Sequence, residues 1–288
     1  MTRVVTLNGG PVTDIPPGYV DGLAEAIYHA HPSLSSTQAR ALLDSPARYR
    51  WEREHPKPPT REMQLGTCLH TTVLGAGQDW EELPEGDGRT TAVKEAKREI
   101  EARGHIALSP DEAAKVKGMA AAVLRHPQAG PLLAGDGIAE RSLFWRDPVT
   151  GVDCRARLDW LLSNGRAIVD LKTTGDASRN AIGKHIDRYG YHIQKAWYED
   201  GARTLELAAE DSTWLWVFVE REAPHMVTVA TLAPVDAAIG VDLAARAREM
   251  YRDCAEAGLW PNGEQYPDHI ITTSLPPWSR RSYEEEQW

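Results

Sequence analysis

Cysteine is scarce in this chain of 288 residues, which contains only Cys68, Cys154 and Cys254. The number is odd, the three positions are far apart, and none of them belongs to a CxxC pair. Such a set excludes a disulfide framework and a cysteine-ligated zinc or iron–sulfur site. We therefore expect three small buried apolar side chains.

Long apolar runs are missing as well. No stretch approaches the roughly 20 consecutive apolar residues of a membrane span. The N-terminus also lacks the basic and then apolar pattern of a secretory signal. These absences predict a cytoplasmic protein that has no membrane partner.

Positive charge is in deficit, because 32 Lys and Arg face 42 Asp and Glu for a formal net charge of −10. Phosphate binding draws on Lys and Arg, so this balance argues against a protein that coats nucleic acid along its length. It does not exclude an enzyme with clustered carboxylates and local nucleic-acid contacts. Charge alone leaves the partner open.

The predicted elements run from helices to a sheet. Residues 1–27 indicate an N-terminal arm, residues 76–90 a surface loop, and the chain from Trp260 an irregular tail. The apolar periodicity predicts helices, the first capped by Ser35 or Ser36 and the fourth begun at Ser109, over 37–53, 61–75, 91–103, 110–126, 188–208 and 235–257. Alternation predicts strands over 138–145, 152–162, 167–173, 213–220 and 225–231. The fold class is α/β or α+β, with a mixed central sheet flanked by helices and a helical N-terminal part.

Two neighbouring strands carry the residues with the most chemistry. The turn Asn164-Gly165 predicts a hairpin that places Asp159 beside Asp170, while Asp170 and Lys172 point the same way. Two adjacent carboxylates repel each other unless a cation lies between them, and hard oxygen ligands favour Mg²⁺ or Mn²⁺. A lysine there orients a water or stabilises charge on a phosphate. Against this stands the common case of solvent-facing Asp and Lys on a half-exposed strand, since a bare DxK often occurs by chance.

The surrounding segments carry a family resemblance. Asp159 and the Asp170-Leu171-Lys172 run resemble the core of the PD-(D/E)xK nucleases, with Leu158 where the signature has proline. The segments HPSLSSTQARALLDSPARYRWE, MQLGTCLHTTVLG, CRARLDWL, IVDLKTTGDAS and YGYHIQKAWYEDG, with a closing LPPW, resemble in order the RecE-type (exodeoxyribonuclease VIII-like) phage exonucleases. The resemblance implies a single PD-(D/E)xK nuclease domain over 28–278, with a helical part at 28–136, a sheet core at 137–257, and an acidic tail at 279–288.

This resemblance implies further site residues. His70 and the carbonyl of Leu171 would complete the metal site, although a lone helical histidine is more often packed or on the surface. Gln194 would lie near the attacking water, and Tyr198, four residues on, shares its helix face. A polar stripe on an amphipathic helix explains Tyr198 equally well. The similar lambda exonuclease has an acidic residue at a place comparable to Glu140, which implies a further metal ligand.

Arginines supply the candidate DNA contacts. Alternation places Arg155 and Arg157 on the same strand face as Asp159, within reach of flanking phosphates, unless one is paired with a nearby acid. Arg40 and Arg48 on the first long helix suit a terminal phosphate. A merely solvated helix face is an equally good interpretation of that helix.

The resemblance also implies an activity and partners. It implies Mg²⁺-dependent, processive 5′-to-3′ digestion of one strand of linear double-stranded DNA in phage-type recombination. The partners would be DNA ends, a RecT-like single-strand-annealing recombinase and other copies of the chain in a ring-shaped homo-oligomer. Two alternatives are a RecB-like or CRISPR-associated nuclease with other polarity, and a catalytically inactive DNA-binding protein on the same fold.

Overall fold

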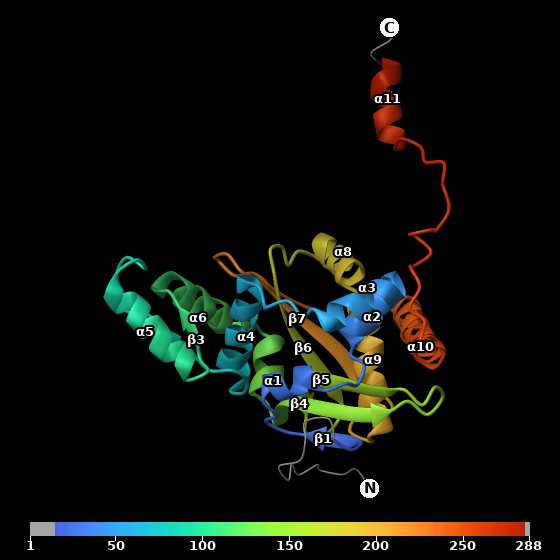
Figure 1. The fold of residues 1–288 in the computed structure, drawn as a ribbon. Coiled ribbons are helices and arrows are strands. Elements are labelled where there is room, and N and C mark those ends of the chain that lie inside the picture. Colours follow the sequence, from blue (N-terminus) through green and yellow to red (C-terminus); the bar gives the residue numbers. More distant parts are fainter. Residues whose placement is uncertain (1–14, 286–288) are drawn as a thin grey trace.

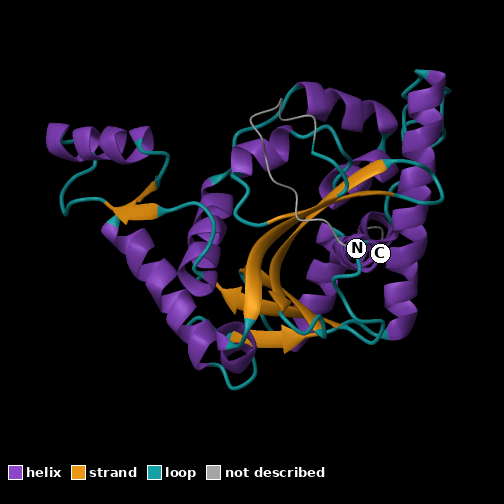
Figure 2. Ribbon diagram, turned by 90° about the horizontal axis from the view of Figure 1, so that it is seen from below, coloured by secondary structure: helices purple, strands orange, loops and turns teal. Residues whose placement is uncertain are grey.

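A twisted six-stranded sheet lies at the centre of the molecule, with helices on both faces (Figures 1 and 2). The computed structural model describes residues 15–285, with side chains to residue 281. Its strands are β1 (Gly18–Val20), β2 (Trp80–Glu82), β3 (Ile106–Leu108), β4 (Gly137–Arg146), β5 (Asp153–Leu162), β6 (Ala167–Thr174), β7 (Thr213–Glu220) and β8 (Val227–Ala230). Its helices are α1 (Glu25–Ala30), α2 (Ser36–Asp44), α3 (Pro46–Glu54), α4 (Arg61–Leu74), α5 (Thr91–Ala102), α6 (Pro110–Arg125), α7 (Ala129–Ala134), α8 (Arg179–Tyr189), α9 (Tyr191–Thr204), α10 (Pro234–Ala257) and α11 (Pro277–Glu285).

The large sheet has the order β1-β4-β5-β6-β7-β8, and only β6 and β7 pair in parallel. A parallel pair needs a crossover connection, which α8 and α9 supply. The expected mixed sheet flanked by helices is confirmed. No helix among residues 15–285 is long and apolar enough to cross a membrane.

Each face of the sheet has its own apolar core. One core joins β5, β6 and β7 to α2, α9 and α10, and includes Trp197 and Trp216. The other joins the opposite sides of β6 and β7 to α4 and α6, and includes Val169 and Leu171. Because side chains alternate along a strand, Val169 and Leu171 face α4 while Asp170 and Lys172 face the layer of α9. Residues of β6 thus face both helical layers, the α4 side and the α9 side.

One expected long helix is divided in two, and another is shorter than predicted. The predicted 37–53 helix ends at Ser45, whose extended backbone (φ −163°, ψ 118°) precedes Pro46. A residue before proline avoids the helical region, and proline lacks the N–H that would continue the helix, so α3 begins anew there. Ser45 caps α3, and Ser35 caps α2 in a capping box with Gln38. The predicted 188–208 helix is present as α9, but it begins at Tyr191, because left-handed Gly190 (φ 67°) separates it from α8, which was not predicted.

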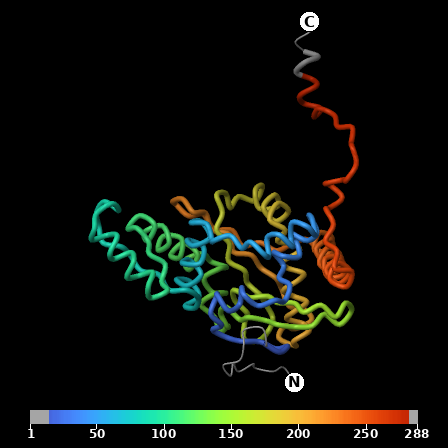
Figure 3. The backbone as a smooth tube through the Cα atoms, viewed as in Figure 1, coloured from blue at the N-terminus to red at the C-terminus, as the bar shows by residue number. Residues whose placement is uncertain are grey.

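Several short elements were not predicted from the sequence. The expected 76–90 loop contains β2, which pairs with β3 in a small parallel sheet. The helices α1 and α7 have six residues each, too few for a clear apolar period. The tail expected to be irregular contains α11, which stands away from the body at the end of an extended segment (Figures 1 and 3).

Both expected boundary segments differ in part from the structure. Within the 1–27 arm, β1 pairs with β4, and Val20 and Leu23 are buried in a third small core. That part belongs to the domain, because its apolar side chains cover Phe144, whereas residues 1–14 lie outside the described residues. The 279–288 tail begins inside α11, and residues 286–288 likewise lie outside the described part.

Candidate metal and catalytic site

Asp159 and Asp170 lie on adjacent antiparallel strands. The pairs Trp160–Val169 and Leu161–Ile168 set the register, which places Asp159 across from Asp170. The Leu171 N–H donates to Asp159 Oδ2 at 2.8 Å. One carboxylate oxygen of Asp159 is thus held by the backbone of β6, and the predicted hairpin geometry is present.

His70 on α4 completes a cluster of three potential metal ligands. One ligand atom each from His70, Glu140 and Asp159 lies within 4.8 Å of the others. The imidazole Nδ1 is 3.3 Å from Glu140 Oε1, and Nε2 is 2.9 Å from the Leu171 carbonyl and 3.7 Å from Asp159 Oδ2. Four of the five predicted metal ligands therefore lie together. The imidazole comes from helix α4, and the two carboxylates and the carbonyl come from strands of the sheet.

Glu140 is held in an uncommon backbone conformation. Its φ is +50°, in the left-handed region that L-residues with long side chains seldom adopt. Ala139 and Arg141 on either side pair with Trp160 and Leu158, but the ladder skips Glu140 and Asp159. The distortion turns the Glu140 carboxylate toward His70, and strain of this kind is typical of functional sites.

The same irregularity interrupts the alternation of side chains along β5. Ala156 and Leu158 pack in the α9-side core, but Trp160 packs in the α4-side core. Alternation therefore breaks at Asp159. A prediction based on strict alternation is wrong across this position.

Asp170 points toward Lys172 and Gln194. Its Oδ2 lies 2.7 Å from Lys172 Nζ, and Gln194 Nε2 donates to Oδ1 at 2.9 Å. Asp170 is 1% exposed, and Oδ2 accepts no hydrogen bond from the described residues apart from this ion pair. Its carboxylate is not part of the three-ligand cluster, so the structure separates Asp170 from His70, Glu140 and Asp159.

Burial and neighbouring charges act on the pKa values of the ionisable side chains at the site. Burial raises the pKa of Asp170 to about 6, and it also raises the pKa of Asp159. Burial acts to lower the pKa of Lys172, but Asp170 and Asp159 outweigh it and hold the pKa above its usual range. Burial likewise acts to lower the pKa of His70, but Asp159 and Glu140 raise it to about 9. The carboxylates therefore favour a positive charge among them.

The donor set suits a hard divalent cation. Two carboxylates, one carbonyl oxygen and one imidazole nitrogen are ligands for Mg²⁺ or Mn²⁺. The buried Oδ2 of Asp170, which pairs with Lys172, adds an oxygen beside them. The residues present fit the metal that the sequence predicted.

Two tyrosines of α9 have different surroundings. Tyr198 packs edge-on against Trp214 at 5.8 Å and joins the α9-side core. Sequence reasoning missed Tyr191, whose ring centroid lies 5.0 Å from Lys172 Nζ. Its signal was present, because Tyr191 precedes Gln194 by three residues and so shares one helix face with it.

The predicted arginines divide as well. Arg155 was expected to contact DNA, but it is 3% exposed, and its Nη1 donates to the His31 and Ser33 carbonyls. That expectation is wrong, because the guanidinium holds an interior loop. Arg157 lies at the site, 4.0 Å from Glu140 Oε2, and stacks over Tyr28 at 4.3 Å.

The helical arginines lie farther out. Arg40 is exposed and rests against Gly190, next to Tyr191. Arg48 forms an ion pair with Asp44 and donates to the Tyr266 hydroxyl at 2.6 Å. Of the two, only Arg40 lies near the catalytic group.

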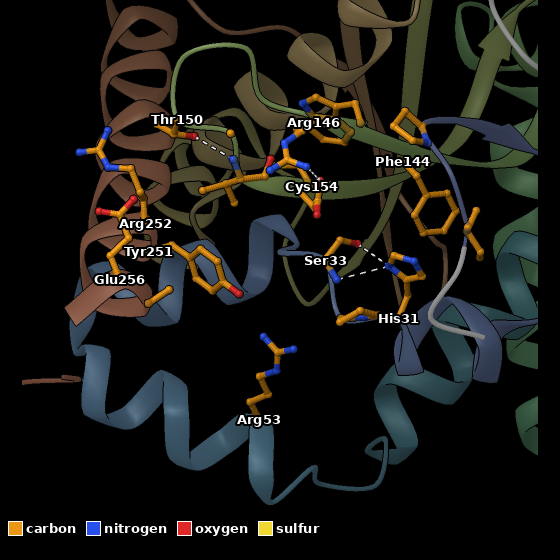
Figure 4. Close-up of a pocket in the computed structure, with 18 residues that line it drawn as sticks. His31, Ser33, Arg53, Phe144, Arg146, Thr150, Cys154, Tyr251, Arg252 and Glu256 are labelled. Atoms are coloured by element: carbon orange, nitrogen blue, oxygen red, sulfur yellow. Dashed lines mark hydrogen bonds and ion pairs between the residues drawn. The ribbon is translucent and has the colours of Figure 1, made fainter. Parts of the chain in front are cut away.

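A cavity of about 610 Å³ lies at the end of β4 and the start of β5 (Figure 4). His31, Ser33, Arg53, Phe144 and Arg252 are among its lining side chains. It contains none of the predicted site residues. The carboxylate cluster instead borders a groove of about 540 Å³ that includes His70, Leu171 and Lys172.

Comparisons with known proteins agree with this geometry. Residues 35–266 match the family described as PDDEXK-like domain of unknown function (DUF3799). No curated protein matches the chain. Among solved structures, a "putative exonuclease" from Eubacterium rectale has a TM-score of 0.56 and 13% identity, covering 89% of this chain and 94% of its own.

A phage related exonuclease from Haemophilus somnus 129PT is more distant. It has a TM-score of 0.33 and 11% identity, covering 79% of this chain and 96% of its own. The family match spans most of the described residues and contains every residue of the cluster. The chain belongs to the family described as PDDEXK-like domain of unknown function (DUF3799).

Proposed function

We propose that this protein is a Mg²⁺-dependent exonuclease that degrades one strand of linear double-stranded DNA. The observation that carries the proposal is the convergence of His70, Glu140 and Asp159 within 4.8 Å, beside the Asp170–Lys172 pair. Mn²⁺ substitutes for Mg²⁺ because both prefer oxygen-rich ligand sets.

The ligands divide between strands and a helix. Asp159, Glu140, the Leu171 carbonyl and His70 would hold the cation, with Asp170 adjacent. The bound cation supplies Lewis-acid polarisation of the scissile phosphate and acidifies a water. To serve as a ligand, one imidazole nitrogen of His70 must be free of its proton. If that nitrogen is Nε2, the Leu171 carbonyl loses the hydrogen bond that it accepts from His70.

Lys172 acts beside the metal ligands. Its Nζ is fixed by Asp170 and by the face of Tyr191, so it presents N–H donors to a water or a phosphate oxygen without reorganisation. Gln194 fixes the other oxygen of Asp170 from the α9 side. Tyr198 packs behind this pair as a positioning residue.

DNA contact is local, in keeping with the net charge of −10. Arg157 lies beside Glu140, and Arg40 lies beside Tyr191, so both flank the site from different elements. Positive side chains at the site with an acidic remainder allow binding of an end without coating of the duplex.

Polarity, biological role and partners rest on the resemblance of the ordered sequence segments to RecE-type enzymes. On that basis we infer 5′-to-3′ digestion in phage-type recombination, in a bacterial cytoplasm, with a RecT-like annealing recombinase as partner. The exposed apolar side chains of the C-terminal segment, including Ile270, Leu275 and Trp278, support a homo-oligomer in which a second copy covers them. A ring is the form that the resemblance implies.

The test is digestion of linear duplex DNA labelled at either end, with Mg²⁺, with EDTA, and beside an intact circular plasmid. Loss of the 5′ label first, only with metal and only from the linear DNA, is the expected result. Loss from the 3′ label would assign RecB-like polarity, and cutting of the circle would assign an endonuclease. Binding without any cutting would leave an inactive DNA-binding protein.

Matched variants tie the activity to the site. Asp159→Asn and Lys172→Met should each lower the cutting rate by roughly 100-fold or more. Asp211→Asn and Lys97→Met, at exposed positions away from the cluster, should cut as the wild type does. Equal rates for all four variants would contradict the site assignment.

A further inference from the structure

The groove beside the catalytic lysine has a wall of aromatic rings. Its lining begins with His70, Leu171 and Lys172 and continues to His185, Tyr189 and Tyr191. His185 and Tyr189 lie with ring centroids 6.0 Å apart and planes 22° apart. Tyr189 and Tyr191 follow at 5.6 Å and 30°. The row therefore leads from the catalytic lysine, which lies over Tyr191, out to the groove mouth.

The backbone is built to make this row. Gly190 has φ 67° and turns the chain between α8 and α9, so that residues on either side of it bring their rings together. A side chain at position 190 would also meet Arg40 Cδ at 2.7 Å. Only glycine meets both demands without strain.

Tyr189 is the solvent-exposed tyrosine of this row. Its side chain is 46% exposed, although Tyr191 beside it is partly buried against the core. Met63 on α4 lines the same groove and is 61% exposed, and Gly66, three residues on, contributes no side chain to it. An exposed tyrosine and an exposed methionine thus line one space of about 540 Å³, a volume typical of sites for small organic ligands.

Positive charge accompanies the aromatic row. Arg221 lines the same groove, and the described residues offer it no carboxylate within 4.0 Å. Lys172 supplies charge at the inner end. Flat rings and an exposed methionine suit a nucleobase, and the cations Lys172 and Arg221 suit its phosphates.

We propose that the groove binds one unpaired nucleotide of the cleaved strand, with its base stacked against Tyr189. The inference rests on the proposed nuclease function and specifies its substrate as a locally melted DNA end. A terminal base that is still paired would bring the other strand with it, so the terminal base pair opens before the strand enters the groove. Tyr189 sets how firmly the strand is held next to the scissile phosphate.

The test uses single-stranded DNA with one 2-aminopurine base, scanned over the first positions from the end, because stacking on an aromatic ring quenches this base. Asp159→Asn is the background, so that the strand stays intact. Quenching is expected at one position, and Tyr189→Leu should abolish it and weaken binding roughly 5- to 50-fold. Tyr189→Phe should retain both signals. Trp51→Leu is the matched control, because Trp51 is 51% exposed and stacked on His55 but lies outside the groove.

A cleavage assay separates this inference from the function itself. The active enzyme should cut an end with a normal base faster than the same end with an abasic nucleotide at that position, and Tyr189→Leu should remove the difference. Equal wild-type rates on both ends, or equal effects of Tyr189→Leu and Trp51→Leu, would overturn the groove assignment. Absence of cutting from every substrate would overturn the nuclease function instead.

Discussion

His70 Nε2 on α4 donates to the carbonyl oxygen of Leu171 on β6 at 2.9 Å, joining two residues that are 101 positions apart in the chain. The contact ties the helical part of the domain to the sheet at the point where Asp159 and Glu140 also converge. A single imidazole thus links the α4-side layer to the carboxylates of two strands. The ion site exists only when both parts are folded together.

Replacement of His70 tests this convergence. His70→Ala should weaken Mn²⁺ binding at least roughly 10-fold, because one ligand and its neighbouring contacts are lost. Isothermal titration calorimetry would measure the dissociation constant. His105→Ala, which removes a histidine paired with Glu81 outside the site, is the control and should bind as the wild type does. An unchanged affinity in His70→Ala would remove His70 from the ligand set.

The left-handed backbone of Glu140 leads to a prediction about the free energy of unfolding. Glu140→Gly and Glu140→Ala both lose the carboxylate, so their difference reports the left-handed φ alone. The glycine variant should be more stable by about 0.5–1 kcal/mol, because alanine pays a steric cost in that region. Urea unfolding of the two proteins measures it. A more stable alanine variant would show that position 140 relaxes to ordinary strand geometry.

Arg155 should behave as a structural residue. Arg155→Ala leaves the His31 and Ser33 carbonyls without a donor and removes a guanidinium packed 5.3 Å from the Tyr28 ring. A loss of about 2–3 kcal/mol in the free energy of unfolding follows. Arg146→Ala, at a side chain that is 67% exposed, should change it by less than about 0.5 kcal/mol. DNA binding lost in Arg155→Ala without any loss of stability would restore the DNA-contact role.

The ion pair between Arg61 and Glu112 gives the stability of the α4–α6 contact a pH dependence. The Arg61 hydrogen bond lowers the pKa of Glu112 from 4.5 to about 2. Because the folded pKa is the lower one, the stabilisation is present above pH 4.5 and is lost as the pH falls toward 2. The side chains are partly exposed, so we expect about 1 kcal/mol or less.

Glu112→Gln isolates this effect. A glutamine preserves the capping box with Ser109 but removes the charge. The difference in unfolding free energy between wild type and variant should shrink as the pH falls from 7 to 3. A difference that stays constant with pH would assign the contribution to the cap alone.

Local sequence patterns determined much of this protein. The Asn164-Gly165 turn fixed the hairpin, because the left-handed Gly165 (φ 68°) suits only a small set of turns. That hairpin placed Asp159 and Asp170 at facing positions of β5 and β6, and the period-2 pattern placed Asp170 and Lys172 on one face of β6. The Ser109 cap likewise marked the start of α6 within the chain. These features depend on neighbours within a few residues, which the sequence displays directly.

Tertiary structure decided the rest. Whether Arg155 faces DNA or the His31 loop depends on β1 and α1 covering that end of the sheet, and no local pattern records such packing. The turn of Glu140 toward His70 breaks strand alternation, and only a contact between distant segments stabilises it. The sequence thus specified the chemical groups and their local spacing. The packing of α4, α8 and α9 against the sheet decided which groups meet, because contacts between distant segments form only in the folded chain.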